Sequence, residues 1–203
     1  MAVFAIAASV NGEPQTYPTE ESIHNLVHYV YDKSIYTYMN WIVDVNHQAD
    51  LIANQILYCQ KCSGKVLQKR ALHFILSYDT TGLEREMSKD QIIQSVFDVE
   101  FCMSQFKLYE YQYMIGVHDN GKNIHLHIVI NPINVWSRNL LNYGIPDYQR
   151  VLKELAGILY LKYRIALAPV SYINENGKLR FGNSGGLLYE NIVYPWDKHL
   201  KCS

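Results

Sequence analysis

Apolar and polar residues alternate strictly between Ile124 and Asn131. A period of two is typical of a strand with one buried face, because successive side chains point to opposite sides of a sheet. One face is wholly apolar and the other carries two histidines. The apolar residues are Ile124, Leu126, Ile128 and Ile130, and the opposite residues are His125, His127, Val129 and Asn131.

A turn joins this segment to a preceding strand, residues 109–117, and makes a hairpin. Asn120-Gly121 is a strong hairpin signal, because a type I′ turn needs positive φ at both central residues. That turn pairs His118 with Asn123, whereas a slip of the turn to positions 121 and 122 pairs His118 with His125. Both registers place His118 on the face that carries the other two histidines, so three imidazoles are expected at one end of the hairpin.

Helical and strand patterns alternate along the rest of the chain. The first helix begins at Thr19, and another opens with the capping box Ser88-Lys-Asp-Gln91. Further helices are expected from Asn46 to about residue 61 and over residues 146–165. Strands are expected over residues 2–9, a candidate for the sheet edge, and over 71–79. A second hairpin is expected over 170–173 and 179–181, and residues 35–45 are ambiguous.

Two hairpins force antiparallel pairing of the strands. The sequence therefore predicts an α+β fold, an antiparallel sheet with helices packed mainly on one face and the histidine cluster on the open face. No internal repeat or linker divides the 203 residues, so a single domain over 1–203 is expected. In the strand over 71–79, His73 and Ser77 share one side. We expect them to line a substrate groove, although a histidine bonded to the backbone at the core edge is an equally good interpretation of His73.

The charge balance limits the kinds of partner. Net charge is −1 and the isoelectric point about 6.7, so no global basic field indicates nucleic acid. A polyanion would have to be held by a local patch, a metal and stacking aromatic side chains. The clearest positive cluster is Lys61, Lys65, Lys69 and Arg70, although such clusters are more often ordinary solvated surface.

Cysteine usage and the N-terminal segment indicate the compartment. Cys59-Gln-Lys-Cys62 has no second pair for a zinc ribbon and no thioredoxin-like context. This usage favours a reduced, cytoplasmic protein. Residues 1–10 are apolar but lack a basic flank and are too short to cross a bilayer, so no membrane insertion is expected.

Three histidines with matching parity within ten residues favour a metal centre. Three imidazoles suit a divalent ion that keeps open positions for substrate. A histidine-rich hairpin end that merely packs or caps is the alternative interpretation, and it would be preferred for a single histidine. The candidate ligands are His118, His125 and His127.

Three motifs resemble the His-hydrophobe-His (HUH) relaxases, the MobA/TraI-like, MobP-type mobilisation nucleases of plasmids and conjugative elements. Asn25-Leu-Val-His-Tyr29-Val-Tyr-Asp-Lys33-Ser34 is similar to the family's tyrosine motif followed by a lysine. His73-Phe-Ile-Leu-Ser77-Tyr-Asp79 is similar to its His-xxx-Ser strand. The most specific of the three, His118-Asp-Asn-Gly-Lys-Asn-Ile-His125-Leu-His127-Ile-Val-Ile-Asn131, resembles its metal motif. The resemblance covers roughly residues 20 to 170.

The resemblance implies an activity and its machinery. Tyr29 would be the nucleophile that forms a 5′-phosphotyrosine linkage and frees a 3′-hydroxyl, with Mn²⁺ or Mg²⁺ as the cofactor. Tyr31 is the rival nucleophile; it lies about 200° further around the helix, so both cannot face the metal. The partner would be single-stranded DNA at an origin of transfer, with auxiliary relaxosome proteins and a coupling protein as further candidates.

Several weaker candidates have equally plausible structural roles. Lys33 could hold a phosphate beside Tyr29. Asp119 could orient an imidazole or simply be solvated on the turn. Asn131 could bond a phosphate or end the strand before Pro132.

Two departures from the family pattern affect these expectations. The turn Asn120-Gly121-Lys122 replaces a second acceptor that the family commonly has, so the first ligand would sit slightly differently. The chain also stops at Ser203 without the large C-terminal region of such relaxases, which indicates an isolated nuclease domain or a minimal member. The alternatives are a rolling-circle replication initiator or transposase of the HUH type, and a DNA- or partner-binding module whose histidines hold a structural metal.

Overall fold

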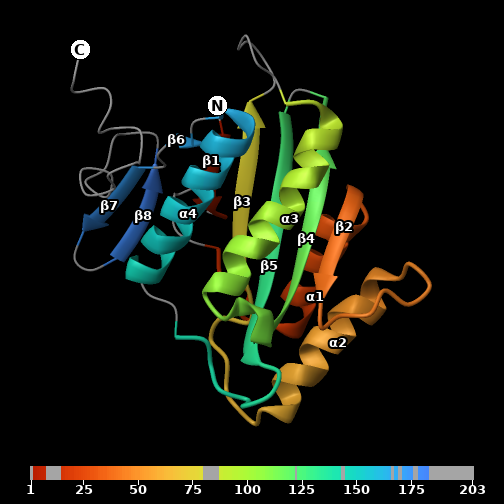
Figure 1. The fold of residues 1–203 in the computed structure, drawn as a ribbon. Helices are drawn as coiled ribbons and strands as arrows, with labels where there is room; N and C mark the ends of the chain where they lie inside the picture. The colour runs from red at the N-terminus through yellow and green to blue at the C-terminus, as the bar shows by residue number, and fades with distance from the viewer. Residues whose placement is uncertain are drawn as a thin grey trace, which may run out of the picture.

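The computed structural model describes residues 2–7, 15–79, 87–121, 123–142, 145–165, 167–168, 171–175 and 178–182. Its centre is a six-stranded sheet in the order β2-β4-β5-β3-β1-β6 (Figure 1). Neighbouring strands are antiparallel, except that β6 runs parallel to β1. The strands are β1 (Ala2–Ile6), β2 (Ser34–Asn40), β3 (Leu72–Asp79), β4 (Tyr111–Asp119), β5 (Asn123–Asn134) and β6 (Leu167–Ala168).

Four α-helices and a short 3-10 helix accompany this sheet. Thr19 caps the first helix, and Ser88 and Gln91 form the expected capping box of the third. A separate antiparallel pair is formed by β7 (Ser171–Glu175) and β8 (Lys178–Gly182). The helices are α1 (Glu20–Tyr31), α2 (Ala49–Cys62), α3 (Lys89–Gln105), η1 (Leu108–Glu110) and α4 (Ile145–Tyr163).

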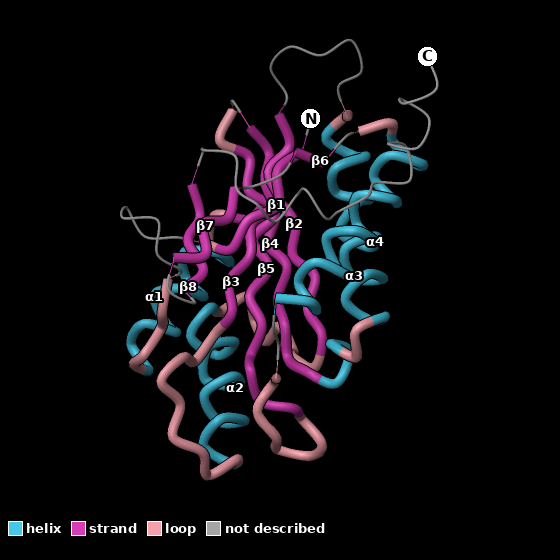
Figure 2. The backbone as a smooth tube through the Cα atoms, turned by 90° about the vertical axis from the view of Figure 1, so that its left-hand side faces the viewer, coloured by secondary structure: helices cyan, strands magenta, loops and turns pink. Residues whose placement is uncertain are grey.

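The sheet lies between two helical layers, α1 with α2 and α3 with α4, as Figure 2 shows. The larger core fills the α3–α4 side and includes the apolar face of β5, for example Leu126 and Ile128. A smaller core fills the other side, where α1 and α2 pack on Met114 of β4 and Val129 of β5. Among the described residues, no helix is long and apolar enough to cross a membrane.

The predicted α+β fold with an antiparallel sheet is confirmed, but helices cover both of its faces. The reason is visible in β4, where residues 111–118 are all buried, so that neither face of this central strand meets solvent. The histidines share the α1–α2 face. They lie further along β4 and β5, toward the turn, so their face is only partly covered.

The hairpin between β4 and β5 adopts the slipped register. His118 pairs with His125 and Asp119 with Ile124, which leaves positions 121 and 122 in the turn. Gly121 has φ +80°, a conformation that favours glycine, and Lys122 lies outside the described residues. The prediction that the three histidines share one face is confirmed in this register, because both registers keep them on the same side of the sheet.

Other expected elements are present with shifted boundaries. The ambiguous segment after α1 forms β2, and α2 begins at Ala49 with Gln48 as its N-cap because Asn46 adopts φ +57° in the preceding loop. The first strand ends at Ile6; it pairs with β3 and β6 and so is not the sheet edge, while residues 8 and 9 lie outside the described residues.

Candidate metal centre and adjoining tyrosine

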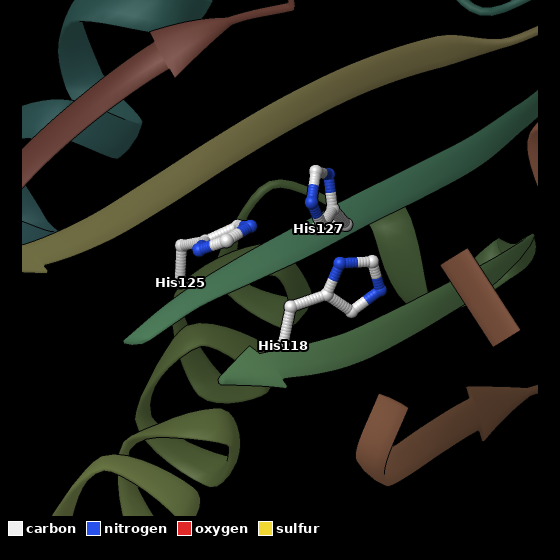
Figure 3. A group of neighbouring side chains, drawn as sticks. All are labelled: His118, His125 and His127. Atoms are coloured by element: carbon white, nitrogen blue, oxygen red, sulfur yellow. The ribbon is translucent and has the colours of Figure 1, made fainter. Parts of the chain in front are cut away.

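Three histidines converge at the turn end of the β4–β5 hairpin. His118 projects from β4, and His125 and His127 project from the same side of β5 (Figure 3). With one ligand nitrogen taken from each ring, the three nitrogen atoms lie within 4.8 Å of one another. Metal–nitrogen bonds are about 2 Å long, so a short movement of the half-buried His125 ring brings the three donors around one ion.

A chain of side-chain hydrogen bonds fixes the orientation of His127. Its Nδ1 lies 2.8 Å from Nε2 of His73, and Nδ1 of His73 lies 2.7 Å from the Tyr17 hydroxyl. Tyr17 in turn donates to Oε1 of Gln15 at 2.6 Å. Because the Tyr17 proton is committed to Gln15, its oxygen accepts from His73, and Nε2 of His73 then accepts from Nδ1–H of His127.

That tautomer leaves Nε2 of His127 with a free lone pair. The atom is buried and has no hydrogen-bond partner in the described structure. An orphaned buried polar atom is unfavourable unless something binds it. A metal ion is a suitable occupant, because it needs an unprotonated imidazole nitrogen. The opposite tautomer would bury an N–H group there without an acceptor.

His118 is oriented by the end of α1. Its Nε2 donates to the carbonyl oxygen of Val30 at 2.8 Å, which leaves Nδ1 available as a ligand. Gly116 makes this contact possible, because a Cβ at that position would meet Val30 of α1 and Ser34 at the start of β2. The absence of a side chain lets α1 lie directly on the sheet.

Burial keeps the cluster neutral at ordinary pH. Desolvation, assisted by His73, lowers the pKa of His127 to about 2, and desolvation lowers that of His73 to about 4. The pKa values of His118 and His125 are also lowered, mainly by burial. Neutral imidazole is the form that binds a metal. The donor set therefore fits a divalent ion.

Tyr29 lies against this cluster from α1. Its ring is edge-on to His118 and His127, with centroid separations of 5.4 and 5.2 Å. Its side chain is 43% exposed, so a ligand can reach the phenol. Lys33 Nζ lies 4.5 Å from the centroid of the same ring. The structure thus brings Tyr29 and Lys33 to the histidines.

Tyr31 points to a different part of the surface. Its hydroxyl donates to Oδ2 of Asp44 at 2.7 Å and lies 3.1 Å from Nδ1 of His47. Burial and the Asp44 carboxylate raise the pKa of Tyr31 to about 12. The structure therefore separates the two tyrosines, as their helical spacing predicts.

A cavity of about 540 Å³ adjoins the histidines and Tyr29. It lies between α1, β3 and the segment that precedes α1. Among the residues that the structure describes, its wall contains no lysine, arginine or carboxylate side chain and instead offers amides, hydroxyls and rings. The polar and aromatic contributors include Gln15, Thr16, Tyr17, Asn25, Tyr29 and His73.

Two weaker candidates occupy positions near the turn end of the hairpin. Ser77 pairs with His125 on the same face of the sheet. Asp119 accepts from the amide of Gly121 and from Lys89 Nζ, which hold it on the turn. It points to the α3 side because it directly follows His118 in a strand, which favours a structural role on the turn over one in orienting an imidazole.

Asn131 is a buried structural residue and does not face a ligand. Its Nδ2 donates to Gln112 Oε1, and its Oδ1 accepts from Gln60 Nε2 and from the amide of Ile133. With 1% exposure it cannot bond a phosphate. The expectation that it ends the strand before Pro132 is also wrong, because β5 continues to Asn134.

Two residues of the site were missed by sequence reasoning. Tyr17 lies far from the histidine motif in sequence, and among so many tyrosines nothing distinguishes it. Gly116 had a signal, because a lone glycine inside an apolar strand often marks close approach by another backbone segment.

Comparison with known proteins identifies the family. Residues 29–163 match relaxases of the description "MobA/VirD2-like, nuclease domain". A solved structure described as "Molecular Basis of Vancomycin Resistance Transfer in Staphylococcus aureus" has a similar fold, with a TM-score of 0.53 and 11% identity over 85% of this chain and 100% of that chain. Curated proteins gave no significant match. The matched span contains Tyr29 and the whole histidine hairpin, and the chain belongs to the MobA/VirD2-like relaxase nuclease-domain family.

Proposed function

We propose that this protein is a relaxase, a site- and strand-specific single-strand DNA endonuclease that nicks an origin of transfer through a covalent 5′-phosphotyrosine intermediate. Family membership supports the nuclease class. The observation that carries the chemistry is the position of Tyr29, whose ring lies against His118 and His127.

His118, His125 and His127 would hold the cofactor, with Mn²⁺ or Mg²⁺ as the proposed ion. Once bound, the ion would stabilise negative charge on the non-bridging oxygens of the scissile phosphate. The three neutral imidazoles add no charge of their own, so they leave the full positive charge of the ion for the phosphate. His73 and Val30 keep two of these rings in the tautomer that offers a lone pair.

Tyr29 performs the transfer step in this proposal. Its phenol oxygen attacks phosphorus, an O–P bond to tyrosine forms, and the bond from phosphorus to the 3′ oxygen breaks. The phenol gives up its proton and the departing 3′ oxygen gains one, so the products are 5′-phosphotyrosine and a free 3′-hydroxyl. The linkage keeps the energy of the broken phosphodiester, which allows the strand to be rejoined later. Lys33, beside the Tyr29 ring, supplies a positive charge for a neighbouring phosphate.

The remaining parts of the proposal concern location and partners. The protein would act in the cytoplasm as a single nuclease domain over residues 1–203. Single-stranded DNA at an origin of transfer would be its substrate, with auxiliary relaxosome proteins and a coupling protein as partners. The cavity beside Tyr29 is suited to the sugar and base next to the scissile phosphate, because the described part of its wall offers amides, hydroxyls and rings.

A covalent adduct provides the test. The protein is incubated with labelled single-stranded DNA and Mn²⁺ or Mg²⁺, and adducts are sought on a denaturing gel. We expect an adduct that Tyr29→Phe removes and Tyr31→Phe preserves, because Tyr31 is bonded to Asp44 away from the histidines. Peptide mapping should place the DNA on Tyr29.

Other outcomes point to different functions. DNA mapped to Tyr31 would overturn the assignment of the nucleophile. Cleavage that persists in Tyr29→Phe without any adduct would indicate a water nucleophile and an ordinary metal-dependent nuclease. Metal binding with neither adduct nor cleavage would leave a binding module with a structural metal.

A further inference from the structure

The cavity beside Tyr29 offers a polyanionic strand little positive charge apart from Lys33 beside the Tyr29 ring. Among the described residues its wall contains no lysine or arginine, and the whole chain carries a net charge of −1. Affinity for a nucleic-acid backbone comes largely from lysines and arginines that displace counterions from phosphates. If the proposed substrate is correct, most of this affinity must arise on another surface.

One such surface lies on the outer side of α1 and α2. A hollow of about 650 Å³ lies there between the first half of α1, the second half of α2 and the loop that follows α2. Its wall carries three cations, Lys61, Lys65 and Arg70, and one carboxylate, Glu20. This local excess of positive charge contrasts with the balanced composition of the chain.

A second hollow of about 270 Å³ adjoins the first at Tyr58 of α2, which lines both. Its wall adds the indole of Trp41 and the guanidinium of Arg138. Tyr58 is 71% exposed, and Trp41, which is half exposed, lies edge-on to the more exposed Trp136 at 4.9 Å. Large aromatic side chains are thus presented to solvent beside a cation.

Two residues that line this second hollow have an unfavourable backbone conformation. Trp41 and Arg138 have φ of +56° and +59°, which bulky residues rarely adopt. The Trp41 carbonyl accepts from Gln112 Nε2, and its indole donates to the carbonyl of Tyr109 at 2.7 Å. Strain of this kind is typical of functional sites, and here it keeps an indole on the surface.

The first half of α1 lies between the first of these hollows and the cavity beside Tyr29. Glu20 and His24 line the hollow, and Ser22 and Asn25 line the cavity on the other side of the same helix. Arg70 lies at this corner, where its Nε donates to the carbonyl of Pro18. A DNA strand that leaves the cavity beside Tyr29 therefore reaches the cations by passing the N-terminal end of α1.

We propose that a surface here called the α2 groove binds the single-stranded DNA that flanks the scissile phosphate. Its cations contact successive phosphates and its aromatic rings stack with bases, the combination by which proteins hold single strands without reading their sequence. This inference rests on the proposed nicking function, for which it supplies the missing affinity. The groove consists of Lys61, Lys65, Arg70, Arg138, Tyr58 and Trp41.

The test measures binding of fluorescein-labelled oligothymidines by anisotropy in metal-free buffer, where no cleavage occurs. Lys61→Gln/Lys65→Gln should weaken binding of an oligomer of about 30 nucleotides about tenfold at low salt and make the logarithmic salt slope shallower by about 1.4. Tyr58→Ala should weaken it at least about fivefold through lost stacking.

The matched control is Lys107→Gln/Lys153→Gln, which removes the same charge from the α3–α4 side, where both lysines are exposed. It should bind the long oligomer as the parent does. Equal losses in the two double variants would mean diffuse attraction and would overturn the proposal. Unchanged affinity in the groove variants would also overturn it and leave the exposed rings to a protein partner.

This result is separable from the nuclease assignment. If binding depends on the groove but the protein forms no adduct, the α2 groove is supported and the proposed nuclease function is contradicted. If the protein forms the adduct but its groove variants bind DNA normally, the nuclease function is supported and the α2 groove is contradicted.

Discussion

The backbone of Gly116 in β4 lies directly against Val30 at the end of α1. A Cβ at Gly116 would lie 2.6 Å from Cγ1 of Val30 and 2.4 Å from Oγ of Ser34. The carbonyl of Val30 accepts the hydrogen bond from His118 Nε2, and Tyr29 is the residue before it. One close contact therefore sets the orientation of His118 and the height of Tyr29 above the histidines.

Gly116→Ala should separate metal binding from DNA cleavage. The new methyl group displaces α1 and carries Tyr29 away, at a cost of about 1–3 kcal/mol in the free energy of unfolding. Because a shift of about 1 Å can cost on the order of a hundredfold in rate, adduct formation should fall by at least tenfold. Mn²⁺ affinity should change less, since two of the three ligands lie on β5. Single-turnover adduct assays and calorimetry give the two quantities.

The matched control for this prediction is Gly157→Ala in α4. A Cβ there meets no atom within 4 Å, so adduct formation should match the parent, while stability should rise by about 0.5–1 kcal/mol because alanine favours the helix over glycine. Adduct formation at the parent rate in Gly116→Ala would show that the approach of α1 does not position the nucleophile.

His73 should act as a positioning residue for the metal site. His73→Ala removes the acceptor that holds Nδ1–H of His127, and loss of such a partner costs about 10–100-fold in metal affinity. His73→Gln keeps an acceptor oxygen and should recover part of the loss. Tyr17→Phe, which removes a hydroxyl one step further from the site, should have a smaller effect. Calorimetry with Mn²⁺ measures the affinities.

A spectroscopic readout distinguishes this role from a purely structural one. Nitrogen chemical shifts of the metal-free protein should show His127 protonated at Nδ1 in the parent and a mixture of tautomers in His73→Ala. Metal affinity and tautomer populations unchanged by His73→Ala would contradict the positioning role.

One divalent ion should bind per chain, and His125 offers the cleanest test. His125 is partly exposed and lies outside the buried core, so His125→Ala leaves the core intact, whereas His127 has only 2% exposure. We expect loss of tight Mn²⁺ binding with a melting temperature close to that of the metal-free parent. The comparison variant is His47→Ala, which removes a histidine outside the cluster and should leave Mn²⁺ binding intact. Calorimetry that shows parent-like affinity in His125→Ala would mean that the site is misassigned.

The metal-free protein should lose stability in acid through its buried histidines. The folded protein keeps His73 neutral down to a pKa of about 4, whereas the unfolded chain takes up the proton near 6.5. Because the pKa of His73 is lowered in the folded state, the stability that this residue contributes is fully present above pH 6.5 and is lost as pH falls. At pH 5 the loss from His73 alone is about 2 kcal/mol. Urea unfolding of the parent and of His73→Gln in chelator at pH 7.5 and 5.0 measures it.

The comparison between the two proteins isolates this residue. The pH-dependent loss should be smaller in His73→Gln by about the same 2 kcal/mol. Other groups contribute in the opposite sense, since Asp32 and Asp50 raise the pKa of His28, but they are unchanged in the variant. An identical pH dependence in both proteins would show that His73 is not held neutral by burial.

The strand content and the histidine motif could be predicted from the sequence because both depend on local periodicity. Alternation along β5 fixed which residues share a face, and parity brought His118 onto the face of His125 and His127 in either hairpin register. Helical spacing predicted that Tyr29 and Tyr31 would point apart, although it could not say which of them lies over the histidines. These predictions needed only residue types and the repeat of a strand or a helix.

The tertiary structure decided everything that depends on long-range contacts. It placed α1 and α2 on the histidine face, so that β4 is buried on both sides. It also brought Tyr29 to the cluster through the contact between Gly116 and Val30. The bond from Tyr17 to His73 joins residues 56 positions apart, and periodicity carries no information at that separation. The turn register and the buried network around Asn131 were likewise set by packing, because only folding specifies which polar groups meet away from water.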